Sequence, residues 1–304
     1  MKAFTYKLGI IGCGNMAEAI LKGILDSKFL KSVEIFALEI NQQRKEYISG
    51  KYHILFADSL RSLVKSSEYI LISVKPQSIS SLLDKLKTCF DYRQNVVISI
   101  AAGVSTNYIA HKLKSDAPVI RIMPNTPAMV KKGMAAISQG IYAAGEDVEF
   151  AKKLMGSLGN FIVIDEKFQD TVTAISGSGP AYFFLFCKYL IEAALKNGLD
   201  QATSEMLAIN TMVGAGEMMQ KFEMSADHLI KMVASPGGTT EIALNKFIEN
   251  DLEKIVLRCL EKNPKDRFQD VAGLERALAA CERADKWTDE MAEKWWSDSG
   301  VSLD

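Results

Sequence analysis

The chain has 304 residues, of which 48% are hydrophobic and 24% charged, and its formal net charge is −1. This composition describes a globular protein with room for two or three domains, and it argues against a broad surface for nucleic acid or anionic membrane. Because the five cysteines are odd in number and far apart, and the three histidines are scattered, we expect reduced thiols, a cytoplasmic location and no metal site.

The first predicted element is a short apolar strand, Lys7–Ile11, that enters a glycine-rich turn. Gly12, Gly14 and Ala17 form the pattern G-x-G-x-x-A at the start of a helix predicted to run to about Asp26. In this pattern the first glycine permits a tight turn, the second lets the backbone approach a pyrophosphate, and the small third residue keeps the helix close to the strand. The N–H groups at the helix start hold the phosphate charge. We therefore predict dinucleotide binding, against the alternative of a strand-turn-helix packed by small residues.

Glu39 follows a second predicted strand, Val33–Ala37. An acidic residue at this place normally bonds the 2′-hydroxyl of the adenosine ribose, which favours NADH over NADPH. Arg44 and Lys45 lie nearby and are candidates to accept a 2′-phosphate, although a solvated helix face explains them better. The sequence leaves both coenzymes, NADPH and NADH, open.

More apolar runs alternate with helical segments, which predicts a Rossmann-type parallel sheet with right-handed crossovers. The further predicted strands are Ile54–Phe56, Tyr69–Val74, Val96–Ile100, Val119–Met123 and, around a helix at Asp147–Leu158, Ala135–Ser138 and Phe161–Ile164. Ligands of such sheets bind beyond the carboxyl ends of the strands. The predicted coenzyme-binding residues are Ile11, Gly12, Cys13, Gly14, Asn15, Met16, Glu39, Ser73, Val74, Lys75, Pro76, Ala101, Ala102 and Gly103.

Beyond the Gly/Ser-rich stretch Gly177–Tyr182 the pattern is helical throughout. The first helix, about Ala181–Lys196, is shorter than a membrane span and carries charged residues, so no membrane association is expected. Further on, Ser235–Thr240 is a glycine-rich loop that opens a helix predicted to reach about Asn250. Backbone N–H groups at such a start form an anion site, for which a substrate carboxylate is the expected ligand; the alternative is a plain helix cap.

Six motifs, in this order, give the chain its resemblance to a known family. They are Gly12–Ala17, Val74–Gln77, Ala101–Gly103, Met123–Pro127, Ser176–Tyr182 and Ser235–Thr240. Residues from about 6 to 250 resemble pyrroline-5-carboxylate reductase. The resemblance implies reduction of 1-pyrroline-5-carboxylate to L-proline, the last step of proline biosynthesis, with NADPH or NADH. It also implies a helical dimerisation domain and a homodimer or larger ring with a shared active site.

The resemblance assigns the substrate side. It implies that Thr240 places its hydroxyl near the imine nitrogen, and that Thr239 and Met232 contact substrate largely through backbone. Glu166 falls at a substrate-side position, with a surface carboxylate as the alternative. The predicted substrate-binding residues are Glu166, Met232, Ser235, Gly237, Gly238, Thr239 and Thr240, with Thr240 also catalytic. The expected domains are 1–165 for the dinucleotide, 166–250 for dimerisation and substrate, and 251–304 as an atypical tail.

The tail from about Asp251 looks like the end of a bacterial-type serine/threonine kinase C-lobe. The likeness rests on Arg258–Phe268, Val271–Cys281 and Trp287–Trp296, while Leu252–Lys262 is a candidate replacement for the last reductase helix. Kinase activity is excluded because the chain has no kinase Gly-rich loop and no V-A-I-K, H-R-D or D-F-G motif. A fusion remnant, a gene-model or cloning join and an engineered graft all stay open as its origin.

Two other functions compete with imine reduction to proline. A related Rossmann reductase for another imine or a β-hydroxyacid is one; the hydroxyacid enzymes need a helical-domain lysine, and only Lys188 and Lys196 stand on the first long helix, outside any motif. A catalytically silent nucleotide-binding scaffold is the other. The complete run Ser235–Thr240 argues against the scaffold, because a protein without turnover has no need of a carboxylate site.

Overall fold

The structure is a computed structural model that describes residues 4–114, 116–249, 252–259 and 266. Contacts divide the chain into two compact units, Met1–Leu185 and Phe186–Asp304, and each unit is described by itself. The boundary falls within the long helix α8, Gly179–Lys196.

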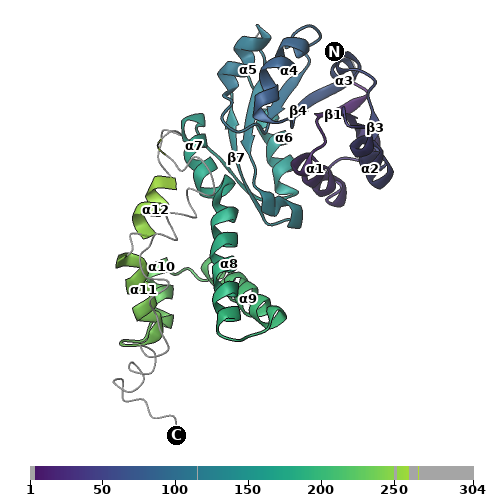
Figure 1. Cartoon of the computed structure of the whole chain (residues 1–304). Helices are drawn as coiled ribbons and strands as arrows, with labels where there is room; N and C mark the ends of the chain where they lie inside the picture. Colours follow the sequence, from purple (N-terminus) through teal and green to yellow (C-terminus); the bar gives the residue numbers. More distant parts are fainter. Residues whose placement is uncertain (1–3, 115, 250–251, 260–265, 267–304) are drawn as a thin grey trace. The chain divides into compact units, whose positions relative to one another are not determined.

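The first unit is built on one eight-stranded sheet with the order β3-β2-β1-β4-β5-β6-β7-β8 (Figure 1). The strands are β1 (Tyr6–Ile11), β2 (Ile35–Leu38), β3 (Leu55–Phe56), β4 (Ser67–Ile72), β5 (Val96–Ser99), β6 (Val119–Met123), β7 (Gly133–Gln139) and β8 (Gly159–Val163). All neighbours are parallel except β6 and β7, which are antiparallel. The predicted fold class, a Rossmann-type sheet followed by a helical domain, is confirmed.

The antiparallel pairing of β7 departs from the parallel sheet that strand-helix alternation predicts. Between β6 and β7 the chain holds only one short 3-10 turn, Thr126–Val130. A parallel neighbour needs a crossover of a dozen or more residues, usually through a helix, whereas a short connection returns the chain in the opposite direction. Between β7 and β8 the helix α6, Gly145–Gly156, supplies that crossover, and these two strands are parallel.

Each face of the sheet is covered by its own helices, which explains the near-continuous apolar strands. The helices α1 (Asn15–Asp26), α2 (Gln42–Tyr52) and α6 contribute to one buried cluster, and α3 (Leu60–Ser66), α4 (Ile79–Leu86) and α5 (Thr106–Leu113) to the other. Residues of β4 alternate between the clusters: Tyr69 and Leu71 belong to the first, Ile70 and Ile72 to the second. The central strands are therefore buried on both sides.

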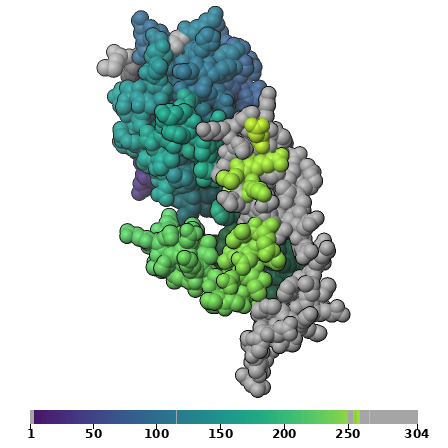
Figure 2. Space-filling model, turned by 90° about the vertical axis from the view of Figure 1, so that its left-hand side faces the viewer, coloured from purple at the N-terminus to yellow at the C-terminus, as the bar shows by residue number. Residues whose placement is uncertain are grey.

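The second half of the described chain is helical, as the sequence predicts. After α7 (Gln169–Val172) and a π-helical turn at Thr173–Gly177 comes α8, followed by α9 (Gln201–Lys221), α10 (Ala226–Val233), α11 (Thr239–Glu249) and α12 (Leu252–Cys259). In Figure 2, α10 and α11 form the green surface of the second unit. Within the described ranges, no helix is long and apolar enough to cross a membrane.

Most of the predicted tail lies outside the residues that the structure describes. Of the kinase-like run Arg258–Phe268, the structure describes only residues 258, 259 and 266. The stretches Val271–Cys281 and Trp287–Trp296 lie outside the described residues.

Truncating a side chain to alanine should lower the free energy of unfolding more on a central strand than on an edge strand. Leu8 on β1 is fully buried, whereas Leu55 on β3 is 59% exposed. We expect Leu8→Ala to lower the free energy of unfolding by about 3 kcal/mol, because it opens a cavity in a close-packed core. Leu55→Ala, the matched control, should stay within about 0.5 kcal/mol of the parent. Urea unfolding followed by circular dichroism measures both; equal losses would contradict the described burial.

Candidate active site

The strand register brings the predicted coenzyme-binding segments to one edge of the sheet. Ile11 pairs with Ile72, and Ile72 pairs with Ser99, so the residues that follow β1, β4 and β5 leave the sheet side by side. The approach is close, since a Cβ built on Gly12 would lie 2.9 Å from the Ser73 carbonyl oxygen. This edge is the carboxyl end of parallel strands, where ligands of such sheets bind.

The glycine-rich turn has the shape that a pyrophosphate requires. Gly12 adopts a φ of 86°, in the left-handed region that favours glycine, and its N–H donates to the Leu38 carbonyl at 2.9 Å. At Gly14 an added Cβ would meet nothing within 4 Å, and Gly14 and Asn15 are both exposed at the start of α1. The open space lies where a second glycine admits the phosphates to the helix N-terminus. These residues fit a dinucleotide.

The other predicted coenzyme segments frame the same edge. Ser73 donates its backbone N–H to the Ile11 carbonyl at 2.9 Å, which ties the two strand ends together. Lys75 and Pro76 are exposed where a short 3-10 turn begins, and Val74 is half-buried. Of the remaining segment, Ala101 is buried, Ala102 half-buried and Gly103 exposed with a φ of 73°. Backbone and small side chains therefore face the place where a nicotinamide coenzyme lies in this fold.

Two side chains from the region after β2 bind the peptide groups of Cys13. Glu39 accepts the Cys13 N–H on Oε2 and the Asn41 N–H on Oε1, both at 2.8 Å. Arg44 donates from Nε to the Cys13 carbonyl at 2.6 Å. The Cys13 thiol is buried, and burial together with the Glu39 carboxylate raises its pKa to about 12, against the opposing effect of Arg44. This thiol stays protonated and is not a nucleophile.

Glu18 on α1 holds Arg44 from the other side, a contact that the sequence does not predict. Its carboxylate accepts hydrogen bonds from Arg44 Nη2 at 2.5 Å, from Lys51 at 3.0 Å and from the hydroxyls of Tyr52 and Tyr47 at 2.9 and 3.0 Å. Desolvation works to raise the pKa of Glu18, but the four hydrogen bonds outweigh it and lower the pKa to about 2. The carboxylate is therefore charged throughout the physiological pH range.

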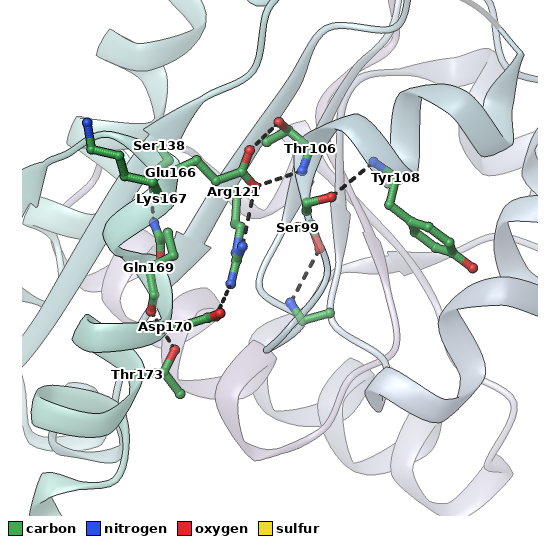
Figure 3. Close-up of polar contacts among 12 residues, drawn as sticks. Ser99, Thr106, Tyr108, Arg121, Ser138, Glu166, Lys167, Gln169, Asp170 and Thr173 are labelled. Atoms are coloured by element: carbon green, nitrogen blue, oxygen red, sulfur yellow. Dashed lines mark hydrogen bonds and ion pairs between the residues drawn. The ribbon is translucent and has the colours of Figure 1, made fainter. Parts of the chain in front are cut away.

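Glu166, predicted on the substrate side, belongs to a partly buried ion-pair network in the first unit (Figure 3). Its carboxylate accepts the backbone N–H and the hydroxyl of Thr106, the first residue of α5, at 2.8 and 2.6 Å. Arg121 on β6, only 6% exposed, donates to Glu166 and to Asp170, each at 3.3 Å. Both carboxylate oxygens of Glu166 are thus engaged within the protein. Arg121 and Thr106 are absent from the residues that the sequence singles out as functional.

Neighbouring polar groups fix the same part of the chain. Gln169, fully buried at the start of α7, donates to the Ser138 hydroxyl at 2.8 Å and to the Ala136 carbonyl at 3.2 Å. In the Met123–Pro127 motif, Asn125 donates to the Ser176 carbonyl at 3.1 Å and accepts the Met134 N–H at 2.9 Å. The path from the sheet to α8 is therefore held by side chains of β6, β7 and α7.

In the second unit, the Ser235–Thr240 loop opens α11 as predicted. Gly237 has a φ of 74°, and its N–H donates to the Glu241 carboxylate at 2.7 Å; Gly238 donates to the Ser235 carbonyl at 2.9 Å. Glu241 thus places a carboxylate against a backbone donor of this loop. Thr239 and Thr240 are the first residues of the helix, with Thr240 half-buried, and Met232 on α10 is 56% exposed.

In the described part of the chain, no group of three or more His, Cys, Asp or Glu residues is placed to bind a metal ion.

Comparison with known proteins decides the family. A family model described as pyrroline-5-carboxylate reductase dimerisation matches residues 166–267, and one described as NADP oxidoreductase, coenzyme F420-dependent, matches residues 7–103. The chain is 32% identical over 260 residues to pyrroline-5-carboxylate reductase 2 of Bacillus subtilis (strain 168), covering 85% of this chain and 93% of that protein. The chain belongs to the pyrroline-5-carboxylate reductase family.

Solved structures agree. A pyrroline-5-carboxylate reductase from Coxiella burnetii matches with a TM-score of 0.76 and 29% identity, over 90% of this chain and 98% of that one. The reductase of Plasmodium falciparum with NADP bound matches with a TM-score of 0.76 and 27% identity, over 92% of this chain and 100% of that one. The predicted activity, a pyrroline-5-carboxylate reductase that oxidises NAD(P)H, is confirmed, and the dimerisation match supports self-association.

The comparisons give no support to a kinase-like tail. The dimerisation match continues to residue 267, past the point near Asp251 where the sequence was expected to leave the family.

The Arg121 network gives a measurable stability prediction. Replacing Arg121 by Met leaves the Glu166 carboxylate largely buried without its cation, which should cost about 3 kcal/mol in the free energy of unfolding. The double variant Arg121→Met/Glu166→Gln should recover part of that loss, because the unpaired charge is gone. Urea unfolding measures these two variants and Glu166→Gln alone, with Lys7→Met, from the more exposed Lys7–Glu68 pair, as a control expected to cost less than about 1 kcal/mol. Strictly additive effects at Arg121 and Glu166 would contradict a shared network.

Proposed function

We propose how this reductase holds its substrate and which residues carry the reaction. The substrate is 1-pyrroline-5-carboxylate: its ring nitrogen takes up a proton, its C=N carbon accepts a hydride, and L-proline and oxidised coenzyme result. The coenzyme supplies the hydride, and the protein supplies position and charge. A cyclic imine protonates readily, so the reaction needs little acid–base machinery.

The observation that carries the substrate assignment is the Gly237–Glu241 contact. A carboxylate already accepts a hydrogen bond from the Ser235–Thr240 loop, at 2.7 Å from the Gly237 nitrogen. The substrate carboxylate has the same charge and the same acceptor geometry. The positive end of α11 adds to the attraction. In our proposal the substrate carboxylate takes the place of Glu241, which is exposed and free to turn into solvent.

With the substrate carboxylate on the Ser235–Thr240 loop, the other site residues can be assigned their roles. Thr240, the second residue of α11, places its hydroxyl within hydrogen-bond reach of the ring nitrogen, while Thr239 and Met232 contact substrate through backbone. Ser235, Gly237 and Gly238 form the carboxylate loop. We place Glu166 as a positioning residue, because its oxygens are bound by Thr106 and Arg121. The coenzyme is held by the fourteen residues predicted above, from Ile11 to Gly103.

The assembly and location are proposed on the same basis. We propose a homodimer or larger ring formed by a dimerisation domain that begins near residue 166, where the family match begins. Exposed apolar side chains on α9, among them Met206, Ile209 and Val213, support a helical surface that pairs with another copy. A cytoplasmic location rests on the cysteine pattern. The absence of nucleic acid as a partner, and the kinase likeness of residues 251–304, stay predictions from sequence with no part in this reaction.

Turnover with separate coenzymes and the Thr240→Val variant tests this function. We expect oxidation of NADH or NADPH that depends on 1-pyrroline-5-carboxylate, and a fall in kcat of about tenfold in Thr240→Val, because one lost hydrogen bond to the ring nitrogen costs about 1 to 1.5 kcal/mol. Thr211→Val, on an exposed part of α9, is the control. Coenzyme binding without turnover in the parent protein would favour a silent scaffold, and an unaltered kcat in Thr240→Val would remove the hydroxyl from the mechanism.

Glu241 gives a second test, aimed at the carboxylate loop. Glu241→Gln weakens the internal competitor for the Gly237 N–H, because a neutral amide oxygen accepts less strongly than a carboxylate, so KM for 1-pyrroline-5-carboxylate should fall by about fivefold while kcat stays close to that of the parent. Glu249→Gln, at the other end of α11, removes an equal charge and serves as the control. A rise in KM for Glu241→Gln would mean that Glu241 supports the loop and does not compete with substrate.

A further inference from the structure

Two side chains that bind the same residue, Cys13, bear on the choice between NADH and NADPH in this chain. Glu39 accepts the Cys13 N–H, and Arg44 donates to the Cys13 carbonyl. In this fold an acid after the second strand bonds the adenosine ribose hydroxyl, whereas an arginine nearby takes up the 2′-phosphate of NADPH. The coenzyme that binds better therefore depends on which of these two groups is available.

Arg44 is held by contacts within the protein and is not available to a phosphate. Its Nε bonds the Cys13 carbonyl, its Nη2 pairs with Glu18 Oε2 at 2.5 Å, and its guanidinium lies 5.2 Å from the centre of the Tyr47 ring. Glu18 is itself fixed, because Lys51, Tyr47 and Tyr52 also donate to it. To reach a phosphate, Arg44 would have to leave contacts on three sides. Such multiply bonded arginine–carboxylate pairs are specific in geometry and strong.

Glu39, in contrast, lies directly after β2, at the place where this fold puts the acid that bonds the adenosine ribose. Its two oxygens accept the N–H groups of Cys13 and Asn41, and each oxygen retains capacity for a further hydroxyl donor. A 2′-phosphate at the same place would meet a fixed negative charge at short range, which is unfavourable. Lys45, the other cation nearby, lies with Nζ 5.8 Å from the centre of the Phe56 ring.

We propose that this chain prefers NADH over NADPH, and that Glu18 enforces the preference by holding Arg44 against the glycine-rich turn. Glu18 is a positioning residue, since it acts on the coenzyme through Arg44. The inference concerns coenzyme selectivity, and it does not depend on the substrate roles proposed for Thr240 or the Ser235–Thr240 loop.

Coenzyme affinity without substrate provides the test. The full chain is titrated with NADH and with NADPH, the nicotinamide fluorescence gives each Kd, and the readout is the ratio of the two. We expect NADPH to bind about tenfold more weakly than NADH to the parent protein. In Glu18→Gln the ratio should fall by about fivefold, because Arg44 is released to the phosphate. In Glu18→Gln/Arg44→Gln the gain should disappear, which a loosened fold alone would not produce.

Two further variants complete the test. Glu68→Gln breaks the Lys7–Glu68 pair on the same sheet and should leave the ratio unchanged. In Arg44→Gln alone, the ratio of the NADPH Kd to the NADH Kd should stay within about twofold of the parent, because the committed arginine does not contact the phosphate and the loss of its Cys13 contact affects both coenzymes alike; this holds as a test even where Glu18→Gln fails to fold. A parent protein that binds NADPH as tightly as NADH, or a tenfold rise in the ratio of the NADPH Kd to the NADH Kd in Arg44→Gln, overturns the proposal.

Discussion

The peptide group on each side of Cys13 is the point on which the coenzyme half of this protein depends. Glu39 binds its N–H and Arg44 its carbonyl, so the turn between β1 and α1 is fixed by side chains that arrive from the region after β2. A glycine-rich turn has little intrinsic rigidity, because glycine loses more conformational freedom on folding than other residues. The charged contacts supply the order that the glycines cannot. They also bring the ribose-side acid and the nearest arginine into one cluster, so that turn geometry and coenzyme choice are coupled.

The sheet explains why this cluster forms where it does. Parallel strands buried on both faces by α1, α2 and α6 on one side and α3, α4 and α5 on the other leave their carboxyl ends as the open edge. The register that pairs Ile11 with Leu38 and with Ile72 places Gly12, Glu39 and Ser73 at neighbouring positions on that edge. Core packing thus sets the register, and the register sets which polar groups meet.

The sequence predicts the parts of this architecture that have a local signature. Apolar runs located all eight strands, and G-x-G-x-x-A and Ser235–Thr240 located both glycine loops, because spacing along the chain decides those features. The antiparallel β7 was missed because its signal is the lack of a helix at Thr126–Val130, which apolar periodicity does not register. The sequence does not predict two ion pairs, Arg121 with Glu166 and Glu18 with Arg44. Their partners are 45 and 26 residues apart, and only the folded sheet brings them together. A surface carboxylate and a buried ion pair look alike in one sequence.

The two glycine-rich loops both bind a carboxylate of the chain through a backbone N–H, but they differ in how firmly that carboxylate is held. Each opens a helix, and each has an N–H that donates to a carboxylate of the chain, Cys13 to Glu39 and Gly237 to Glu241. Glu39 is tied by a second backbone donor at Asn41, so its charge stays in place and takes part in selecting what binds. Glu241 is exposed on the first turn of its own helix, so in our proposal the substrate carboxylate takes its place at little cost. Backbone N–H groups suit both loops, because their charge does not change with pH and their direction is fixed by the main chain. An enzyme whose substrate is a readily protonated imine then needs few titrating side chains, which accounts for motifs made of glycine, serine, threonine and proline with no histidine among them.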